Sequence, residues 1–465
     1  VWVAIADVSE YVTPGSPLDK GAFKKGNSVY MPDRVEPMLP EELSADLCSL
    51  RPNEDRACLA VQMRFNSKGV KTGHKFVRGL MRSHARLTYA QAQSGFDGKP
   101  TPEAAPVMDI LTDIFAAYQC LKKGRTDRAP LDIDMPERKV KLDDKGNVVS
   151  IETKERFDAH KLVEEFMIQA NVAAAEQLER KNMPLIYRVH EPPEREKVQG
   201  LADFLPALDL KWSMGERITT RRFNRLLAQA QDKDMAETVG MSVLRTQSKA
   251  VYSPKNGGHF GLNLTHYAHF TSPIRRYADL IVHRALISAH GWGEDGLTQA
   301  DADGLKETGE HISQTERRSM MAERDTTDRY LAAFLSEHVG EEMGGRISGV
   351  VKFGVFVKLD ATGADGLIPV RSLGREYFNF DADSATLMGS ESGVLIGLGQ
   401  RVTVKLASAT PETGGVELEL LTLDGKDLPR GGGGGFKGRG KPARRKASNA
   451  KRKADKVKRK VKRTR

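Results

Sequence analysis

The sequence predicts an α+β protein: a mixed α/β core, then a small β-barrel of the OB type, then a disordered basic tail. Three observations support this prediction. Up to about residue 340, short apolar runs typical of strands alternate with long segments of helical periodicity. After Gly344-Gly345 the pattern changes to short period-2 runs, which are typical of a barrel. Residues 430–465 contain 17 Lys/Arg and one acid, so this segment has too few apolar groups to fold.

The composition limits the classes of protein that fit. The net charge of +10 belongs to the tail, so any nucleic-acid channel in the mildly acidic remainder is a local feature. No run of 18 apolar residues occurs. Three cysteines without CxxC spacing fit the reducing cytosol and argue against a disulfide framework or a zinc site. The chain opens on Val1-Trp2-Val3-Ala4-Ile5-Ala6, which predicts a buried strand, and we expect further residues upstream of it.

The first half of the core combines short strands with helices and a hairpin. Residues 101–124 have helical periodicity, and Lys139–Ile151 alternates around Asp144-Lys145-Gly146-Asn147, which predicts a hairpin. Short β-like runs with turn-rich connections precede them. The expected strands are Val1–Ala6, Ala60–Phe65 and Lys75–Met81.

A long helix is predicted from Asp158, which we expect to cap it, to about Lys181. Glu165 falls on its polar side. Glu164 lies at the rim of the apolar arc, within about 40° of His160 and Asn171. A partly buried carboxylate is unfavourable unless it is paired or used, so this ridge is either a satisfied core network or part of a site. The apolar arc consists of Leu162, Val163, Phe166, Met167, Ala170, Ala173, Ala174 and Leu178.

The second half of the chain is predicted to be helical and then stranded. Residues 193–250 and 303–338 are largely helical in pattern, and residues 345–422 have the period-2 runs of the barrel. A glycine run, Gly431–Gly435, links the barrel to the tail. Three glycines lie where barrel strands would bend: Gly349, Gly354 and Gly366.

The stretch from residue 258 to 284 is the most informative part of the chain. A polar approach that contains His259 ends at Ser272, which we expect to cap a helix with Pro273 in its first position. Arg275 and Arg276 would then lie near the positive end of the helix dipole, where cations are unfavourable. Such a pair is explained by an anion bound at the helix N-terminus, although a solvated arginine pair is an equal alternative.

Aromatic side chains are candidates for stacking on nucleic-acid bases. Tyr30 and Tyr89 are two such candidates, but a single tyrosine is more often a core residue with a bonded hydroxyl. Phe353 and Phe356 in the predicted barrel have a better claim, as do Tyr377, Phe378 and Phe380, although some of these five must fill the barrel core.

Common catalytic motifs are absent from the sequence. It has no P-loop, no GxGxxG after a strand, no HExxH and no GxSxG. No tight group of acids has metal-ligand spacing either.

Several stretches together resemble the RNB superfamily of exoribonucleases, and within it the RNase R branch. The resemblance extends from Val1 to Leu421 and implies an RNB catalytic domain over residues 1–340, an RNA-binding OB domain of the ribosomal-protein type over 345–424, and a basic tail over 425–465. The stretches are VWVAIADVSEYV, SVYMPDRVEPMLPEELSADLCSL, SHARLTY, DAHKLVEEFMIQAN, GHFGLNLTHYAHFTSPIRRYADLIVHR and MAERDTTDRYLAAFL.

The resemblance implies processive 3′→5′ hydrolysis of single-stranded RNA to nucleoside 5′-monophosphates, in RNA decay and quality control, with Mg²⁺ as cofactor. It implies that Arg275 contacts the terminal phosphate and that Glu164 lies beside the last nucleotide, so we expect the two to lie close together in one channel. The implied RNA-binding residues are Tyr30, Tyr89, Arg276, His259, Phe353 and Phe356. We also expect a cytoplasmic monomer without a membrane, with the ribosome or other RNA-decay proteins as further partners.

Two departures from the family pattern matter. The aspartates that hold the metal in the family form a D-x5-D-x-D-D run, which we expect upstream of Val1, so the chain alone should bind RNA but cut it weakly or not at all. Leu131-Asp132-Ile133-Asp134 has only aliphatics where relatives place a phenylalanine. The alternatives are a non-catalytic RNA-binding protein on the RNB scaffold, and an adaptor in which the barrel and tail dominate.

Overall fold

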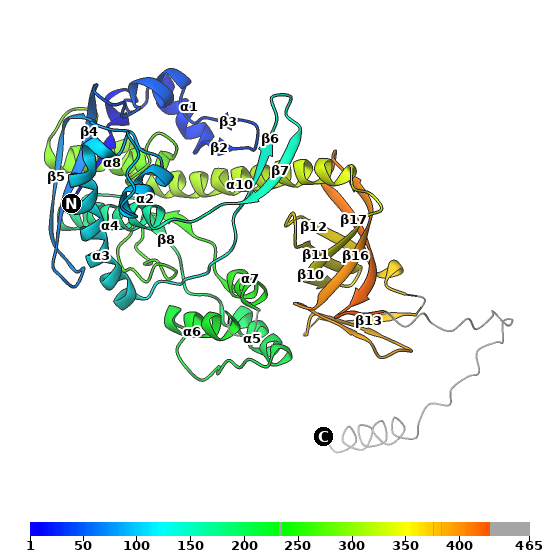
Figure 1. Cartoon of the computed structure of the whole chain (residues 1–465). Helices are drawn as coiled ribbons and strands as arrows, with labels where there is room; N and C mark the ends of the chain where they lie inside the picture. The colour runs from blue at the N-terminus through cyan, green and yellow to red at the C-terminus, as the bar shows by residue number, and fades with distance from the viewer. Residues whose placement is uncertain (232–234, 375, 383, 428–465) are drawn as a thin grey trace, which may run out of the picture. The chain divides into compact units, whose positions relative to one another are not determined.

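The computed structural model of the chain describes residues 1–231, 235–374, 376–382 and 384–427. Gly431–Gly435 and the basic segment after it, predicted to be a linker and a disordered tail, lie outside the described residues. Figure 1 shows the order of the elements along the chain.

A three-stranded antiparallel sheet opens the core. It consists of β1 (Trp2–Ala6), β4 (Asp55–Phe65) and β5 (Lys71–Arg82) in the order β1-β4-β5. The three strands predicted from the sequence are confirmed, although β4 and β5 are longer than expected. Leu59 and Phe76 from the inner face of this sheet are buried in the largest hydrophobic cluster.

Helix α4 (Asp158–Arg180) packs against this sheet and confirms the predicted long helix. Its capping residue differs from the expected one. Phe157 is the N-cap, and its N–H donates to Nδ1 of His160 at 3.1 Å. Asp158 instead lies in the first turn, where a negative charge interacts favourably with the helix dipole.

Helix α8 begins later than predicted from the sequence, at Tyr277 instead of Pro273, so Arg275 and Arg276 precede it. The residues before it form a turn in which the N–H of Arg276 donates to the carbonyl of Ser272 at 3.1 Å. Asp279 in the first helical turn accepts the N–H of Ser272 at 2.7 Å and two N–H groups of the Arg276 guanidinium. The N-cap of α8 is Arg276, and no side chain makes a capping hydrogen bond there, so the cap that we expected from Ser272 was wrong.

A buried ion pair joins α8 (Tyr277–His290) to α1 (Pro17–Lys25). Arg284 donates to Oδ1 of Asp19 at 2.8 Å and to the carbonyl of Val12 at 2.7 Å. The hydroxyl of Tyr277 donates to the same Oδ1 at 2.8 Å. The Arg284 side chain has no exposed surface and that of Asp19 is 8% exposed, so both charges are largely shielded from water and each depends on the other.

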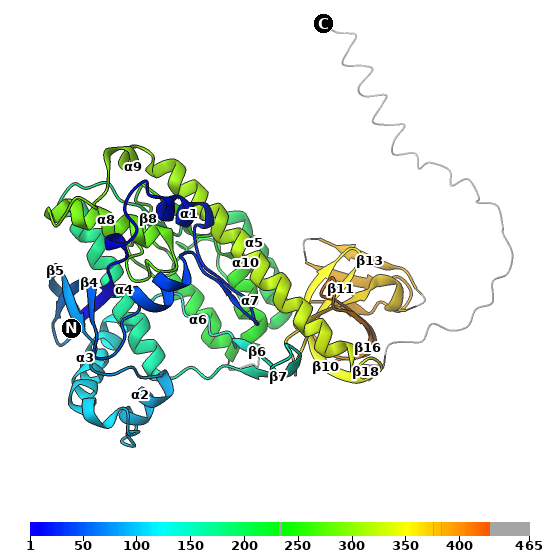
Figure 2. The ribbon, with the colours of Figure 1, turned by 90° about the horizontal axis from the view of Figure 1, so that it is seen from above.

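Helix α10 (Leu305–Ser336) contributes to two separate cores (Figure 2). Its first turns place Leu305 and Ile312 in a cluster with residues of α1 and α8. Its last turns place Leu331 and Leu335 in the core of the barrel. Because an α-helix rises about 1.5 Å per residue, this one continuous helix is long enough to connect the two cores.

The remaining elements of the core include the predicted helices and the predicted hairpin, together with short strands and helices that were not predicted. The helix expected over 101–124 begins at Met108, and the hairpin turns at Gly146 with φ +82°. These elements are β2 (Val29–Tyr30), β3 (Val35–Glu36), α2 (Tyr89–Phe96), α3 (Met108–Arg128), β6 (Arg138–Leu142), β7 (Val148–Thr153), β8 (Tyr187–Val189), α5 (Arg195–Phe204), α6 (Thr220–Gln231), α7 (Ala236–Thr246), β9 (Val251–Ser253) and α9 (Gln299–Asp303).

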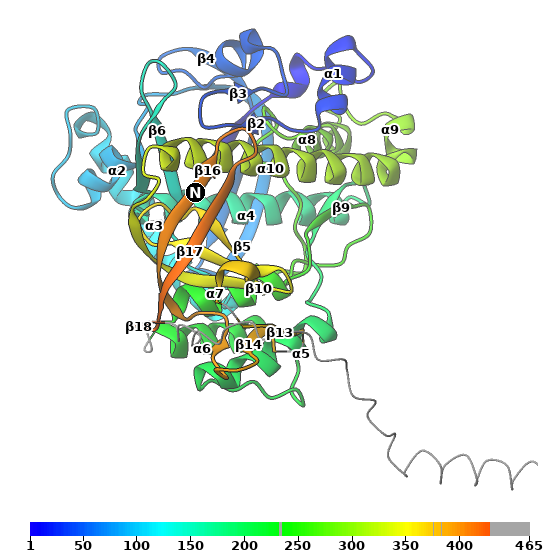
Figure 3. The same cartoon turned by 90° about the vertical axis from the view of Figure 1, so that its right-hand side faces the viewer.

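A closed five-stranded barrel follows α10, as predicted (Figure 3). Its strands have the order β12-β11-β10-β16-β17, and a parallel contact between β12 and β17 closes it. Side chains alternate as expected: Val355, Val357 and Leu359 point into the core, and the residues between them are half-buried. The barrel strands are β10 (Glu342–Val351), β11 (Gly354–Leu359), β12 (Asp365–Pro369), β16 (Arg401–Thr410) and β17 (Gly415–Leu423), and a small sheet contains β13 (Phe378–Asp381), β14 (Thr386–Gly389) and β15 (Leu395–Ile396).

The three glycines expected at strand bends have two different roles. Gly349 lies at a register shift between β10 and β11, where a bulge bends the strand. Gly354 and Gly366 instead allow close packing. A Cβ on Gly354 would lie 2.4 Å from the carbonyl oxygen of Ile368, and one on Gly366 would lie 2.4 Å from the Leu418 side chain.

Within the described ranges, none of the helices combines the length and apolar character that crossing a membrane requires.

The buried ion pair gives a stability prediction. Arg284→Met leaves the Asp19 carboxylate buried without its charged partner, so we expect a loss of about 3–5 kcal/mol of unfolding free energy, measured by urea denaturation. The matched control is Arg324→Met, which removes an exposed 3.7 Å pair with Asp328 and should cost about 0–1 kcal/mol. Equal losses in the two variants would contradict the structural role of the buried pair.

Candidate functional site

The first part of the candidate site is built by backbone pairing between two distant segments. The N–H of Tyr277 donates to the carbonyl of Gly26 at 2.9 Å, and the N–H of Ser28 donates to the carbonyl of Arg275 at 3.1 Å. Gly26 ends α1 with φ +76°, a conformation that suits glycine and turns the chain toward α8. The pairing places Tyr30 and Arg275 at one pocket.

This pocket, the arginine pocket, has a volume of about 230 Å³. Arg275 is exposed, and its guanidinium has no hydrogen-bond or ion-pair partner within the described part of the chain. Tyr30 is 49% exposed, and its backbone N–H donates to the Glu323 carboxylate at 2.7 Å. Glu316 lies two helical turns before Glu323 on α10 and lines the same pocket.

Arg276 also lines the arginine pocket, but its charge is already paired. Its Nε and Nη2 donate to the fully buried Asp279 carboxylate at 2.7 and 2.8 Å. Burial disfavours the charged guanidinium, but the attraction of Asp279 outweighs it and raises the pKa of Arg276. Of the two adjacent arginines, only Arg275 therefore offers an unpaired charge to an anion.

A network of polar side chains extends from the arginine pocket into the core. Glu316 accepts from Arg188 at 2.7 Å, and the Arg188 guanidinium lies 4.6 Å from the ring centre of Tyr252. The hydroxyl of Tyr252 is 3.0 Å from Nδ1 of His269. Burial, together with the charges of nearby arginines, lowers the pKa of His269, so this imidazole is neutral at pH 7.

No role was predicted from the sequence for Glu316, Glu323 or Tyr252. A signal for the glutamates existed, because their seven-residue spacing places both on one face of a helix. Glu323 also belongs to one of the stretches on which the family resemblance was based. Their meeting with Tyr30 and Arg275 depends on tertiary packing.

Tyr89 and Glu164 lie in the second part of the candidate site, at the N-terminus of α4. The Tyr89 ring, 45% exposed, stacks on His160 with ring centres 3.9 Å apart. Burial, then the charges of Lys154 and Arg156, lowers the pKa of His160 and keeps this partner neutral. Glu164 lies one turn further along α4 and lines two clefts.

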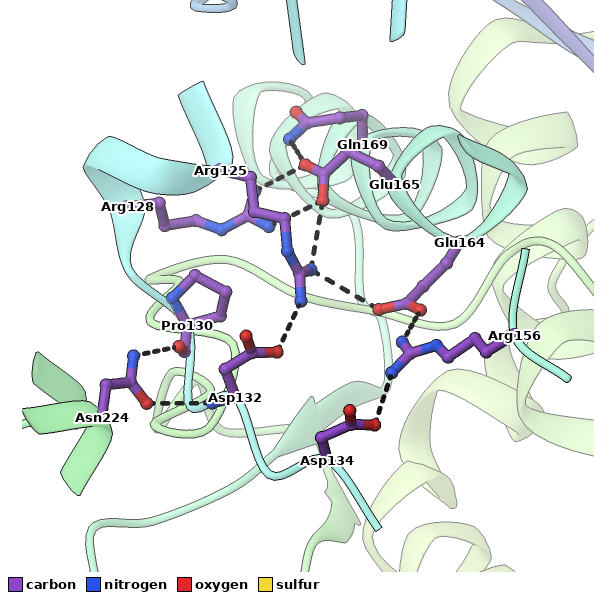
Figure 4. A network of polar contacts seen from close by, with 10 residues as sticks. All are labelled: Arg125, Arg128, Pro130, Asp132, Asp134, Arg156, Glu164, Glu165, Gln169 and Asn224. Carbon is purple, nitrogen blue, oxygen red and sulfur yellow. Dashed lines mark hydrogen bonds and ion pairs between the residues drawn. The ribbon is translucent and has the colours of Figure 1, made fainter. Parts of the chain in front are cut away.

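Figure 4 shows how two adjacent glutamates of α4 differ. Glu164 is half-exposed and is bound by Arg156 at 2.7 Å and by Arg125 at 3.5 Å. Glu165, which was expected on the exposed face, is buried to 1% exposure and accepts two hydrogen bonds from Arg128, each 2.9 Å long. That expectation was wrong.

The physical reason is that α4 is buried on two faces. Ile168 and Val172 lie on the face of Glu165 and pack against Tyr267 in a separate cluster. The single apolar arc identified from the sequence did not include Ile168 and Val172, so it did not reveal this second buried face.

The other predicted RNA-binding residues have different surroundings. His259 is half-buried, and its Nδ1 accepts the N–H of Leu262 at 3.1 Å within its own loop. Burial, then the charges of His190 and Arg188, lowers the pKa of His259 to about 3, so its ring is neutral.

On the barrel, Phe353 is 60% exposed, and its ring is perpendicular to that of the half-buried Phe356, with centres 6.2 Å apart. Phe378, one of the alternative aromatics, is buried in the barrel core.

The structure does not bring Arg275 and Glu164 into one cavity. Among the described residues, the lining of the arginine pocket shares no member with the two clefts at Glu164. Tyr30 and Arg275 therefore form one group, and Tyr89, His160 and Glu164 form another.

A divalent metal would need a set of ligands that these residues do not supply. Mg²⁺ requires several oxygen ligands, among them carboxylates. Among residues 1–231, 235–374, 376–382 and 384–427, three or more His, Cys, Asp or Glu side chains nowhere gather in a way that could hold a metal ion. The described residues therefore do not fit a metal site.

The sequence matches the RNB domain over residues 1–290 and the S1 RNA binding domain over residues 337–420. Ribonuclease R of Vibrio cholerae is 38% identical over 458 residues, which cover 96% of this chain and 55% of that protein. Ribonuclease R of Escherichia coli is 39% identical over 434 residues, which cover 91% of this chain and 53% of that protein. The chain thus spans about half the length of these relatives.

Solved structures share the fold. The apo form of Mycoplasma genitalium RNase R superposes with a TM-score of 0.85 at 29% identity, over 90% of this chain and 66% of that one. The same enzyme in complex with ribose-methylated single-stranded RNA gives the same values. Yeast Ssd1, described as a pseudonuclease, shares the fold with a TM-score of 0.64 at 19% identity, over 83% of this chain and 48% of that one.

The different burial of the two glutamates predicts different losses of stability. Glu165→Ala leaves the Arg128 guanidinium largely buried without its carboxylate, and we expect it to cost about 3–5 kcal/mol. Glu164→Ala removes pairs that are open to solvent and should cost about 0–1 kcal/mol. Urea denaturation of both variants measures the difference, and a larger loss for Glu164→Ala would contradict the burial of Glu165.

Proposed function

The chain belongs to the RNB domain family, and on this premise we propose that it acts in 3′→5′ exonucleolytic hydrolysis of single-stranded RNA to nucleoside 5′-monophosphates, in RNA decay and quality control. The proposal depends on one observation above all. The arginine pocket holds an unpaired, exposed guanidinium beside an exposed tyrosine ring, Arg275 beside Tyr30. These are the two groups that a nucleotide needs, one for its phosphate and one for its base.

In this proposal the charges of the pocket have separate tasks. Arg275 binds the phosphate at the 3′ end and neutralises charge that develops there during hydrolysis. Glu323 accepts the backbone N–H of Tyr30, so it fixes the position of the stacking tyrosine. Glu164 and the Tyr89 ring stacked on His160 contact a different part of the strand, because Glu164 and His160 line other cavities.

The barrel provides a second RNA contact in this proposal. Its aromatic pair, the exposed Phe353 and the half-buried Phe356, can stack on bases of a single strand, and residues 345–424 would act as the capturing domain. We place the protein in the cytoplasm as a monomer, with single-stranded RNA as its partner and ribosomes or other RNA-decay proteins as further ones. Binding should weaken as salt rises, because phosphate contacts release counterions.

The metal site is the feature of the family pattern that the described residues do not supply. The described residues do not fit an Mg²⁺ site, so the tasks assigned to Arg275, Glu323 and Tyr30 are those of binding, positioning and charge neutralisation. We propose that hydrolysis depends on Mg²⁺. We also propose that the 465-residue chain by itself binds RNA but has weak or no activity.

A second candidate function is favoured because the described residues do not fit a metal site. A protein that keeps the RNB fold without a metal site would bind RNA and not cut it, and the fold is shared with yeast Ssd1, a pseudonuclease. A 5′-labelled oligoribonucleotide incubated with the full-length protein in Mg²⁺ and in EDTA distinguishes the two. Stepwise shortening from the 3′ end in Mg²⁺ alone supports the exonuclease, and no shortening with intact binding supports the binder.

The role of Arg275 can be tested by RNA binding. Arg275→Ala should weaken the binding of fluorescein-labelled oligo(A) by about tenfold or more, because a charge-assisted phosphate contact is lost, as measured by fluorescence anisotropy. The control is Arg82→Ala. It removes another exposed arginine, which lies at the end of β5 and is paired with Asp55 of β4. Unchanged affinity in Arg275→Ala would refute the proposed contact.

A separate prediction concerns the barrel. Phe353→Ala should reduce single-strand affinity by about 1–3 kcal/mol, the usual contribution of one stacked base. Leu395→Ala, which removes a side chain of similar exposure from the small sheet, should leave the affinity unchanged. If the two variants bind oligo(A) equally well, the aromatic pair does not contact RNA.

A further inference from the structure

The hairpin of β6 and β7 lies before α4 in the sequence, yet it packs on the barrel. Val140 of β6 is 8% exposed and belongs to the same hydrophobic cluster as the barrel strands and the last turns of α10. Three further hairpin side chains, Leu142, Val148 and Ile151, are partly buried against this cluster. Figures 1 and 2 show the hairpin beside α10. A segment outside the barrel sequence therefore supplies part of the barrel core.

An arginine at the start of the hairpin binds the barrel backbone. Arg138 donates to the carbonyl oxygens of Leu359 at 3.3 Å and Asp360 at 2.9 Å, where β11 ends. In the turn that follows, Gly363 has φ +68°, and a Cβ on this glycine would overlap the Arg138 guanidinium. The close approach of the arginine therefore depends on the bare backbone of this glycine.

A second group of contacts joins the barrel to α7. Glu237 forms a 3.0 Å ion pair with Lys358 of β11, and Arg245 donates to the carbonyl of Ser348 on β10 at 2.8 Å. The Lys358 and Glu237 side chains are 22% and 41% exposed. Ion pairs open to water contribute little stability, whereas burial of apolar surface is favourable in proportion to its area. The hairpin is therefore the stronger of these two attachments.

These attachments limit how the barrel can move on the core. A short connection joins α10, which ends at Ser336, to β10, which begins at Glu342. Short connections of this kind can serve as hinges between two packed bodies. The hairpin binds the barrel through a different strand, β11. This additional attachment restricts the rotation that a single connection would allow.

We propose that the β6–β7 hairpin is a positioning element that holds the barrel in one orientation on the core, with Val140 and Arg138 as its positioning residues. The consequence concerns the length of RNA that binds tightly, and this part rests on the proposed function. A strand that reaches both the aromatic pair of the barrel and the arginine pocket binds at two sites, and a high effective concentration favours its second contact. That concentration falls when the distance between the sites is not fixed. The hairpin thus makes the protein select strands that span both sites.

The attachment of the barrel is tested without RNA. Val140→Asp places a charge in the apolar cluster and should release the hairpin from the barrel. The radius of gyration of the 465-residue chain, measured by small-angle X-ray scattering, should therefore increase. The matched control is Val149→Asp, the same substitution at a position of the same hairpin that is 62% exposed, and it should leave the radius unchanged. Circular dichroism checks that both variants are folded.

The consequence for RNA is measured by fluorescence anisotropy with oligo(A) strands of about 4 to about 24 nucleotides, the shortest of which occupy a single OB fold. The affinity of the unaltered chain should rise steeply once a strand reaches both sites. Val140→Asp should weaken the binding of the longest strand about tenfold or more and leave that of the shortest strand unchanged. A purely structural defect would weaken both equally.

A milder variant tests the same proposal if Val140→Asp does not fold. Arg138→Ala removes two hydrogen bonds to the barrel backbone without placing a charge in the cluster. It should weaken the binding of the longest strand about threefold and leave the shortest unaffected. Its control is Lys139→Ala, at the exposed neighbouring position, which should change neither.

An unchanged radius of gyration in folded Val140→Asp, or equal losses of affinity for the shortest and longest strands, would each overturn the proposal. Failure of the proposed function gives a different result. If the affinity of the unaltered chain did not depend on strand length, the two RNA contacts would be refuted. A larger radius in Val140→Asp than in Val149→Asp would still establish the hairpin as the element that positions the barrel.

Discussion

The buried pair of Asp19 and Arg284 is the constraint on which the candidate site depends. The pair fixes α1 against α8, because both charges are largely shielded from water and each depends on the other. With α1 in place, the chain leaving it at Gly26 pairs with the backbone before α8. That pairing is what places Tyr30 next to Arg275. The arginine pocket is thus a consequence of packing between segments that lie far apart in the sequence.

Charge pairing decides which polar groups remain available for a ligand. Arg276 and Glu165 look equivalent to their neighbours in the sequence, yet each is bound to a buried or nearly buried partner, Asp279 and Arg128 respectively. Such groups serve the fold, because breaking the pair would strand a charge away from water. Arg275 remains free of partners among the described residues, and Glu164 keeps solvent-exposed ones, so these two can respond to an incoming phosphate or ribose.

Helix α10 gives the core and the barrel a common element. Its two ends are buried in different hydrophobic clusters, and its middle presents Glu316 and Glu323 to the arginine pocket. A helix of this length with both ends packed has little freedom to rotate about its axis. The positions of both glutamates are therefore fixed by hydrophobic contacts at either end and not by the pocket itself.

The sequence by itself determined the strands β1, β4 and β5, the long helix α4, the hairpin and the barrel, because the periodicity of apolar residues and the chemistry of turns are local properties. It also identified Arg275, Tyr30, Tyr89 and Glu164 as candidates through motifs. Only the tertiary structure decided which glutamate of α4 is buried, where α8 begins, and that Arg275 and Glu164 line separate cavities. Each of these depends on a partner supplied by a distant segment, Arg128 for Glu165 or α1 for the turn before α8, and local patterns carry no information about such partners.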